Sequence, residues 1–274
     1  MFSNEEKEKA NAFKFALYPM DLLTDYINGD YFTFLDQSVL DDEPRQLPPH
    51  IPKKIIQYWH TARPPFDVQN AIGTLRAHNN TFDYELFNEA TAGEFIEHHY
   101  GSHYRKLFDK NCVHHTMKSD FFRNCYLLKQ GGFYVDVDIR CFNGLDAIIC
   151  NNQFDCFLFY SEGEPYCIDN NFIVCVPENP IIEAILCKQE YNLTAHQSFS
   201  DVWSCTGPGA TSIAIMEILV EKILEDREKT SLDTLKLGPS HLAGRSYEHA
   251  ELAYKRNSEG NWRLFRFPRK LYRL

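Results

Sequence analysis

The stretch of residues 118–138, KSDFFRNCYLLKQGGFYVDVD, constrains the fold of this chain more than any other. Its first part has the apolar spacing of an amphipathic helix. Gly131-Gly132 predicts the end of that helix, because glycine adopts the left-handed cap conformation at little steric cost. The apolar residues 133–135 then predict a short buried strand. Asp136 and Asp138 follow, and the alternation of an extended chain would send both carboxylates to one side.

Two carboxylates at a strand end predict a site for a hard divalent cation. Mg²⁺ and Mn²⁺ prefer oxygen ligands, and they often combine one or two protein carboxylates with substrate phosphates. A cation that joins Asp136 and Asp138 to a diphosphate would relieve the repulsion between the carboxylates and hold a leaving group.

Asp120 and Arg123 are three residues apart on the predicted helix, so their side chains share one face. Two interpretations of this pair stay open from the residues alone. It is either a surface ion pair, which would contribute little to stability, or a pair of side chains that bind a ligand.

Alternating strand and helix patterns predict an α/β fold with a mixed, mainly parallel sheet flanked by helices. The predicted strands cover residues 53–60, 83–87, 154–160 and 172–176, and the predicted helices cover residues 67–80, 90–100, 180–191 and 211–226. The proline-rich segment 41–52 indicates a boundary between residues 1–50, expected to form a helical N-terminal appendage, and a main domain over residues 51–274.

The charge of the chain argues against nucleic acid as a partner. With 38 Asp and Glu against 28 Lys and Arg, the net charge is −10, whereas a general nucleic-acid binder needs a basic face. A phosphate-containing ligand is still compatible, because a metal ion can supply the positive charge. The sequence has no run of 18 apolar residues and no apolar secretory segment, and its nine cysteines form no C-x-x-C pair. We therefore expect a soluble, cytoplasmic protein with free thiols.

Residues 118–138 resemble the core signature of the DXD-motif glycosyltransferases of the sugar-binding-region family, family thirty-two, which includes fungal mannosyltransferases and capsular polysaccharide-type transferases. The stretch is more distantly similar to the clostridial glucosylating toxins. The segment IPKKIIQYWH, residues 51–60, is similar to the opening of the family's domain. The resemblance implies a GT-A fold, a nucleotide-sugar donor, a divalent metal that is usually Mn²⁺ (or Mg²⁺), and retention of anomeric configuration. A UDP-sugar is the favoured donor and a GDP-sugar is the alternative.

The same resemblance implies how the main domain is divided. Residues 51–150 would form the nucleotide-sugar-binding half and residues 151–274 the acceptor-side half. The acceptor would be a glycan, a lipid-linked glycan or a protein. The basic, aromatic tail RLFRFPRKLYRL, residues 263–274, has two interpretations: the fringe of the fold, or a peripheral contact with the inner face of a membrane.

The resemblance also implies roles for the acidic residues and the arginine. Asp138 would coordinate the metal directly, and Asp136 would support it through water while it contacts the donor. Asp120 and Arg123 would hold hydroxyl groups of the donor sugar, because a carboxylate accepts hydrogen bonds and a guanidinium donates them.

Further site residues are implied outside the central stretch. Trp59 would stack on the donor base, although a core tryptophan at a strand end is the alternative. Asn170, or else Asn171, would bind sugar hydroxyls, unless it is a turn residue before a strand. The segment HLAGRSY, residues 241–247, is similar to the family's H-x-x-x-S-W, which would place His241 and Ser246 over the donor.

Two other functions stay open. One is a nucleotide-sugar-binding protein of the same fold without catalysis. The other is a haloacid-dehalogenase-type phosphatase that uses Asp136 and Asp138, although Arg140 occupies the position where that class has Thr or Val. Retention itself has two routes, a double displacement through a carboxylate nucleophile or front-face attack by the acceptor.

Overall fold

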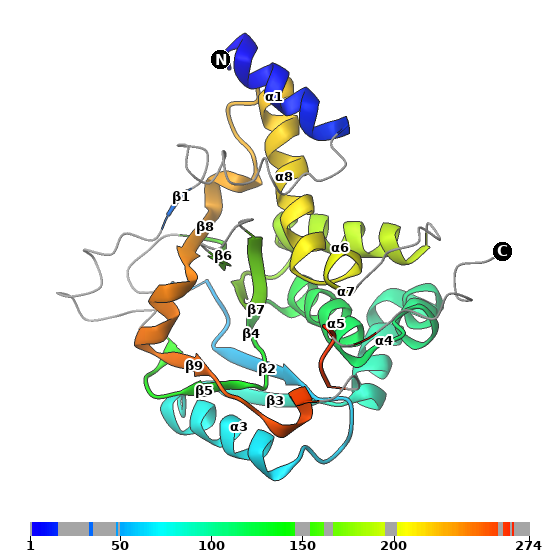
Figure 1. Cartoon of the computed structure of the whole chain (residues 1–274), viewed down its shortest axis with the longest axis vertical. Helices are drawn as coiled ribbons and strands as arrows, with labels where there is room; N and C mark the ends of the chain where they lie inside the picture. Colours follow the sequence, from blue (N-terminus) through cyan, green and yellow to red (C-terminus); the bar gives the residue numbers. More distant parts are fainter. Residues whose placement is uncertain are drawn as a thin grey trace.

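The structure is a computed structural model, and it describes residues 2–15, 33–34, 48, 50–145, 154–161, 167–194, 202–256, 260–263 and 265. A seven-stranded sheet of order β1-β8-β6-β7-β4-β2-β3 forms its centre (Figure 1). The strands are β1 (Thr33–Phe34), β2 (Lys54–Tyr58), β3 (Asp83–Phe87), β4 (Gly132–Val135), β6 (Cys156–Ser161), β7 (Cys167–Cys175) and β8 (Leu235–Pro239). Among the described strands of this sheet, β7 alone runs antiparallel to its neighbours, so the predicted mixed, mainly parallel sheet is confirmed.

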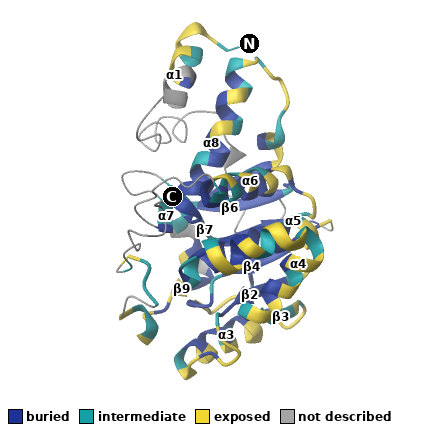
Figure 2. Cartoon of the chain, turned by 90° about the vertical axis from the view of Figure 1, so that its right-hand side faces the viewer, coloured by how far each residue is buried: buried dark blue, intermediate teal, exposed yellow. Residues whose placement is uncertain are grey.

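Helices and a small second sheet cover the two faces. The helices are α1 (Asn4–Phe15), α3 (Phe66–His78), α4 (Glu89–Lys106), α5 (His115–Gln130), α6 (Pro180–Thr194), α7 (Val202–Cys205) and α8 (Pro208–Leu224). Helices α4 to α8 pack on one face in the largest hydrophobic cluster, while α3 and the two-stranded sheet of β5 (Ile139–Cys141) and β9 (Tyr247–His249) lie on the other. Figure 2 shows the central strands buried between these layers.

Helix α5 and strand β4 form as the sequence predicts. The ring of His114 caps the helix by accepting a hydrogen bond from the Thr116 amide at 3.1 Å. Gly131 and Gly132 have φ values of 62° and 94°, and a Cβ on Gly132 would lie 2.7 Å from the Lys54 carbonyl oxygen. Only glycine fits there without displacing β2, which explains the Gly-Gly pair.

Parallel pairing brings the ends of two strands to one edge of the sheet. β2 and β4 are parallel, so Trp59 after β2 and Asp136 after β4 leave the sheet on the same side. The amide of Asp136 donates to the carbonyl of Asn171 on β7 at 2.8 Å, which adds residues 170 and 171 to that edge. Short 3₁₀ turns lie at η4 (Ser231–Thr234), η5 (Ser240–Arg245) and η6 (Ala253–Arg256). A π-helical turn, η2 (Leu107–Asn111), follows α4.

Two features differ from the sequence-based expectations. β1 lies within the predicted helical appendage and pairs with β8, so residues 1–50 are not purely helical. Strand β7 begins at Cys167, before the predicted strand of residues 172–176, so Asn170 and Asn171 lie inside the strand and not in a turn that precedes it. The pairing of β6 with β7 changes register between Leu158 and Tyr160. Helix α1 of the appendage packs on α8, and the Phe2 amide donates to Asp226 at 2.8 Å.

Within the parts of the chain that the structure describes, no helix is both long enough and apolar enough to cross a bilayer.

Candidate active site

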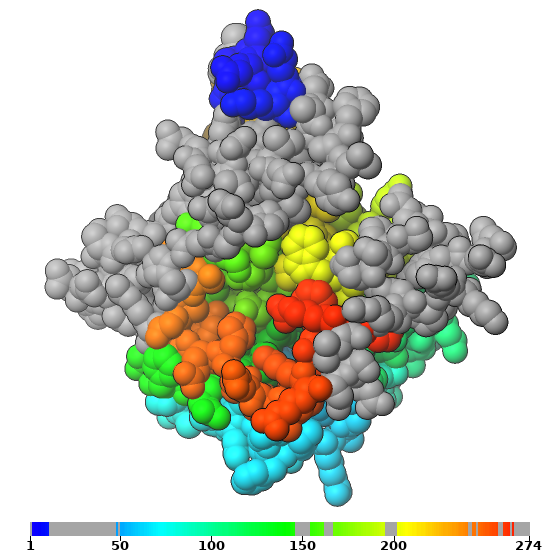
Figure 3. Space-filling view, viewed as in Figure 1, coloured from blue at the N-terminus to red at the C-terminus, as the bar shows by residue number. Residues whose placement is uncertain are grey.

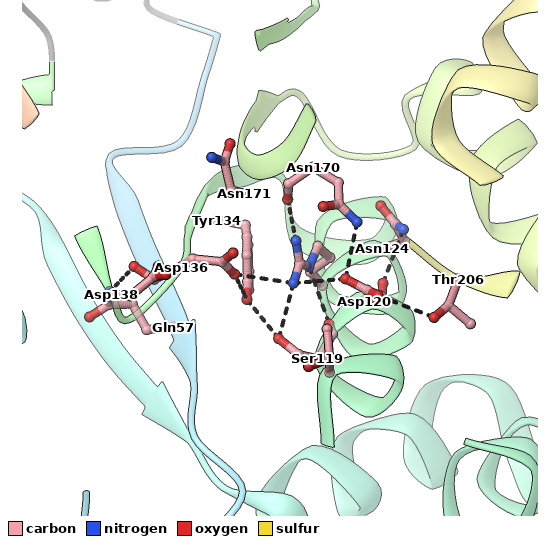
Figure 4. Close-up of polar contacts among 12 residues, drawn as sticks. Gln57, Ser119, Asp120, Asn124, Tyr134, Asp136, Asp138, Asn170, Asn171 and Thr206 are labelled. Carbon is pink, nitrogen blue, oxygen red and sulfur yellow. Dashed lines mark hydrogen bonds and ion pairs between the residues drawn. The ribbon is translucent and has the colours of Figure 1, made fainter. Parts of the chain in front are cut away.

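The centre of the site is the buried guanidinium of Arg123. Its Nη2 lies 3.0 Å from Asp120 Oδ1 and 3.1 Å from Asp136 Oδ1, and its Nη1 donates to the Asn170 carbonyl. Its plane lies over the Tyr134 ring, with 4.1 Å from Cζ to the ring centroid. Arg123 and Asp120 have side chains only 2% exposed, so the surface ion-pair interpretation is wrong. Figure 4 shows Ser119, Asp120, Asp136 and Asn170 converging on this point.

Asp120 is held by neutral donors as well as by the arginine. Asn170 Nδ2 donates to its Oδ1 at 3.0 Å, and the Thr206 hydroxyl donates to its Oδ2 at 3.1 Å. Burial raises the pKa of Asp120 to about 6, although Arg123 opposes the shift. A carboxylate has about four lone-pair sites, so Oδ2 retains capacity for one further donor such as a sugar hydroxyl.

This raised pKa predicts a pH dependence of stability. The folded-state pKa of Asp120 is about 6 against 3.8 in the unfolded chain, so the native state binds more protons between these values. The stability contribution of this group therefore falls as pH rises from 4 to 6, by on the order of 2 kcal/mol. Urea unfolding of the wild type and Asp120→Asn at pH 4, 5, 6 and 7 measures the difference. We expect the fall to be absent in the variant, whose amide can still donate to the Thr206 hydroxyl; parallel pH curves would contradict this account.

Asp136 and Asp138 do not lie on one side of an extended chain, and that prediction is wrong. The chain turns directly after β4, and the Ile139 amide donates to the Asp136 carbonyl at 3.2 Å. The Asp136 carboxylate faces the Tyr134 hydroxyl, 2.7 Å away, whereas the Asp138 carboxylate lies on the other side of the turn (Figure 4). Burial raises the pKa of Asp136, and the charge of Asp138 adds to the rise.

Asp138 has two cationic neighbours from the C-terminal part of the chain. β5 pairs with β9 so that Ile139 lies opposite His249, whose Nδ1 is 3.9 Å from Asp138 Oδ1. The ammonium of Lys255 pairs with Asp138 Oδ2. Burial alone would raise the pKa of Asp138, but the contacts with His249 and Lys255 outweigh it and lower that pKa.

The Asp138 carboxylate in turn raises the pKa of His249, which favours the imidazolium. An imidazolium Nε2 donates, yet it faces the Asn171 amide nitrogen at 3.0 Å, while Asn171 Oδ1 is buried without a hydrogen bond. Exchanging the two ends of the Asn171 amide resolves both conflicts.

Two pockets meet at the acidic turn. The smaller, of about 180 Å³, is bordered by Trp59, His60, His115 and Tyr254, and so has an aromatic character. The larger, of about 750 Å³, lies beside polar groups that include Asp120, Asn170 and Asn171. The rim between them is shared by residues lining both pockets: Thr116, Arg123, Asp136, Asp138, Lys255, Trp262 and Arg263. In Figure 3 residues near 260 meet the α7–α8 region at the centre of this face.

Trp59 lies at the smaller pocket, in the region predicted for the donor base. Its side chain is buried, its indole N–H donates to the Thr61 hydroxyl at 3.0 Å, and the Tyr254 ring packs edge-on at 5.0 Å. Both core packing and contact with a ligand are therefore compatible with its position, and the stacking role stays a prediction.

The remaining predicted residues have different positions. Asn170 and Asn171 both line the larger pocket, with Asn170 bonded directly to Asp120. Ser246 is buried and lines neither pocket, and its carbonyl accepts the amides of Phe142 and Asn143. The role of Ser246 over the donor stays a prediction, and its neighbour Tyr247 lines the larger pocket. The side chain of His241 lies outside the described residues.

Sequence reasoning missed several residues of the site. Ser119 and Tyr134 belong to the central stretch, and their hydroxyls lie 2.8 Å apart beside Arg123. Their positions next to the charged residues of the motif could have indicated that they belong to the site. Thr206 begins the Thr-Gly-Pro segment that leads into α8, and its hydroxyl reaches Asp120. His249 and Lys255 follow no pattern. The pairing of β9 with β5 brings His249 to the site, and the contacts of η6 with Asp67 and Trp59 bring Lys255.

The carboxylates at the acidic turn fit a divalent cation whose remaining ligands come from outside the protein. Among the described residues, no group of three or more His, Cys, Asp and Glu side chains is arranged to hold a metal ion. Asp138 Oδ1 is nevertheless buried without a hydrogen bond, and the Lys255 ammonium on Oδ2 stands in for a cation there. Asp136 Oδ1 is already engaged by Arg123 and Tyr134. Asp138 is therefore the better direct ligand, and substrate phosphates or water would supply the others.

This geometry, a mainly parallel α/β sheet that delivers an acidic pair to the junction of two pockets, is the arrangement expected of a sugar transferase of the DXD type. Residues 65–155 match the family described as "Glycosyltransferase sugar-binding region containing DXD motif". This range contains Asp120, Arg123, Asp136 and Asp138. Over these residues the chain is similar to the DXD glycosyltransferases, and this similarity favours that class over the phosphatase alternative.

Two individual proteins are similar to the chain. It is 25% identical over 161 residues to "Inositol phosphoceramide mannosyltransferase 2" of Schizosaccharomyces pombe, a match that covers 58% of this chain and 45% of the relative. The chain thus spans less than half the length of that relative. Among solved structures, "PaToxG Glycosyltransferase" shows a TM-score of 0.45 at 15% identity, covering 84% of this chain and 92% of the other.

Proposed function

We propose that this chain is a metal-dependent glycosyltransferase that moves a sugar from a nucleoside-diphosphate donor to a hydroxyl acceptor with retention of configuration. The observation that carries the proposal is the position of Asp136 and Asp138 on the rim shared by an aromatic pocket and a polar pocket. A sugar nucleotide has the same order of parts: an aromatic base, a diphosphate and a polar sugar.

The polar network would orient the sugar. Asp120 Oδ2 has lone-pair capacity to accept from one sugar hydroxyl in addition to the Thr206 hydroxyl. Arg123 cannot move, because hydrogen bonds to Ser119, Asn170 and the two aspartates fix its guanidinium. A fixed guanidinium at the rim would stabilise negative charge that develops there without reorganisation during the reaction. Asn170 holds Asp120 in place and lines the sugar side of the site.

The cation, Mn²⁺ or Mg²⁺, would be held by Asp138 directly and by Asp136 through water. When bound, it neutralises charge on the departing diphosphate as a Lewis acid. The residues of this chain position the donor and exclude water around it, and the acceptor supplies the attacking hydroxyl. Double displacement and front-face attack both stay open, because no described carboxylate is assigned as the nucleophile.

The donor is tested by nucleotide release. The protein is incubated with UDP-sugars and GDP-sugars in the presence of Mn²⁺, and the free nucleoside diphosphate is measured. Mannose is the first sugar to test, because the S. pombe relative is named for mannosyl transfer to inositol phosphoceramide. We expect release from one donor class and none after chelation of the metal. Binding without release would favour a non-catalytic binding protein, and neither binding nor release would contradict the proposal.

Trp59→Ala is expected to weaken binding of the nucleotide about tenfold, because stacking of a base on an aromatic ring contributes about 1–3 kcal/mol. Trp59→Phe retains an aromatic face and serves as the control. Calorimetric titration with UDP or GDP at saturating Mn²⁺ measures both affinities. Equal affinities for the wild type and Trp59→Ala would show that Trp59 only packs the core.

The location of the enzyme, its acceptor and its contact with a membrane are also proposals. A cytoplasmic location, a glycan, lipid-linked glycan or protein acceptor, and a membrane contact through the basic tail are consistent with the sequence. Most of that tail, residues 266–274, lies outside the described residues.

A further inference from the structure

Lys255 holds a position that a cation on Asp138 would take. Its ammonium pairs with Asp138 Oδ2, where the carboxylate is 12% exposed and the lysine 34% exposed. The other carboxylate oxygen forms no hydrogen bond, and its ion-pair partner His249 is 3.9 Å away. A divalent cation could replace the ammonium group here, because the carboxylate is buried and one of its oxygens is free to coordinate.

The backbone around Lys255 is anchored by its own hydrogen bonds, whereas its side chain is held by the ion pair with Asp138. The amide of Ala253 donates to Asp67 Oδ2 at 2.8 Å, and Asn261 Nδ2 donates to the Lys255 carbonyl at 2.9 Å. Tyr254 packs edge-on against Trp59. The four-carbon stem of the lysine can therefore turn about its own bonds while η6 stays in place.

Lys255 also lies where a donor's diphosphate must pass. It lines both pockets, so a nucleoside in the smaller pocket and a sugar in the larger one would place the diphosphate beside it. Arg123 lines the same rim, yet its guanidinium is fixed in the buried network. Lys255 is thus a rim cation whose charge can move to meet a phosphate.

We propose that Lys255 is an internal counter-ion: it occupies the cation position on Asp138 in the free protein and turns to the diphosphate of the donor when the divalent cation binds. The inference rests on the proposed function. Its consequence is coupling: the lysine weakens metal binding in the absence of nucleotide and strengthens nucleotide binding in the presence of metal. By reciprocity, cation and donor then promote each other's binding.

The experiment uses the full chain with Lys255→Met. Binding of Mn²⁺ alone is followed by electron paramagnetic resonance of the free ion. We expect about tenfold tighter binding in the variant, because the competing ion pair at a largely buried carboxylate is gone. Binding of UDP or GDP at saturating Mn²⁺, measured by calorimetry, is expected to weaken about tenfold, because a charge-assisted hydrogen bond to phosphate is lost.

Two further variants make the test decisive. Lys222→Met removes another lysine–aspartate pair, that with Asp233 at 2.7 Å, and should change neither affinity. Lys255→Arg retains the charge, so its affinity for Mn²⁺ should lie within about threefold of that of the wild type. This variant keeps the inference testable if Lys255→Met does not fold. A wild type that binds Mn²⁺ and nucleotide while Lys255→Met leaves either affinity unchanged would overturn this inference alone. A wild type that binds neither would overturn the proposed function as well.

Discussion

Arg123→Met should lower the free energy of unfolding by about 3–5 kcal/mol, the cost of removing one partner from a buried ion pair. Methionine fills a similar volume but donates no hydrogen bond, so Asp120 and Asp136 would be left without their shared counter-charge. Urea denaturation at pH 7 measures the effect. Part of the stability should return near pH 4, because protonation removes the uncompensated carboxylate charges.

Arg105 provides a matched control for this prediction. It also pairs with two carboxylates, Glu97 at 3.2 Å and Asp109 at 2.7 Å, but it lies at the surface with its side chain 29% exposed. Arg105→Met should cost no more than about 1 kcal/mol. If the two variants lost the same stability, the buried network around Arg123 would contribute no more to the free energy of unfolding than a surface ion pair does.

Asp138→Asn should reduce kcat/KM for sugar transfer on the order of a thousandfold, because a divalent cation contributes several kcal/mol to stabilisation of the leaving diphosphate. The amide is isosteric with the carboxylate, so the loss reflects charge and not shape. Nucleotide release with the donor found active measures the effect. Asp83→Asn, at an exposed aspartate at the start of β3, is the control and should keep full activity. Substantial release by Asp138→Asn would mean that the cation, if any, binds elsewhere.

The loss of activity in Asp138→Asn must be separated from a loss of folding. The lowered pKa of Asp138 stabilises the folded protein at pH values above its unfolded-state pKa, and this contribution disappears as pH falls through the folded-state value. The variant should therefore melt at a slightly lower temperature than the wild type at pH 7. An inactive protein with a cooperative melting transition supports the assigned role.

The local part of the site could be predicted from the sequence. Asp120 and Arg123 meet because helical spacing places residues three apart on one face, and Gly131-Gly132 ends the helix as predicted. These outcomes depend on local geometry, which a sequence encodes directly. The mainly parallel sheet followed from the alternation of strand and helix patterns, and it is confirmed.

The tertiary part of the site could not be predicted. The alternation rule failed at Asp136 and Asp138 because the strand ends at Val135 and a turn follows, which no residue type in the motif specifies. Lys255 is more than a hundred residues from Asp138 and reaches it through the pairing of β9 with β5 and the contacts of η6 with Asp67 and Trp59. Non-local pairing of short strands leaves little trace in a single sequence, since β-propensity depends strongly on context.

The central claim is that Asp138 binds a cation which binds the donor's diphosphate. Crystals grown with Mn²⁺ and the active sugar nucleotide, measured at the manganese absorption edge, test it most directly. The account predicts one anomalous peak about 2 Å from an Asp138 oxygen and from a phosphate oxygen, with Lys255 turned away from the carboxylate. An Asp138 still paired with Lys255, with manganese and nucleotide bound elsewhere or not at all, would contradict it.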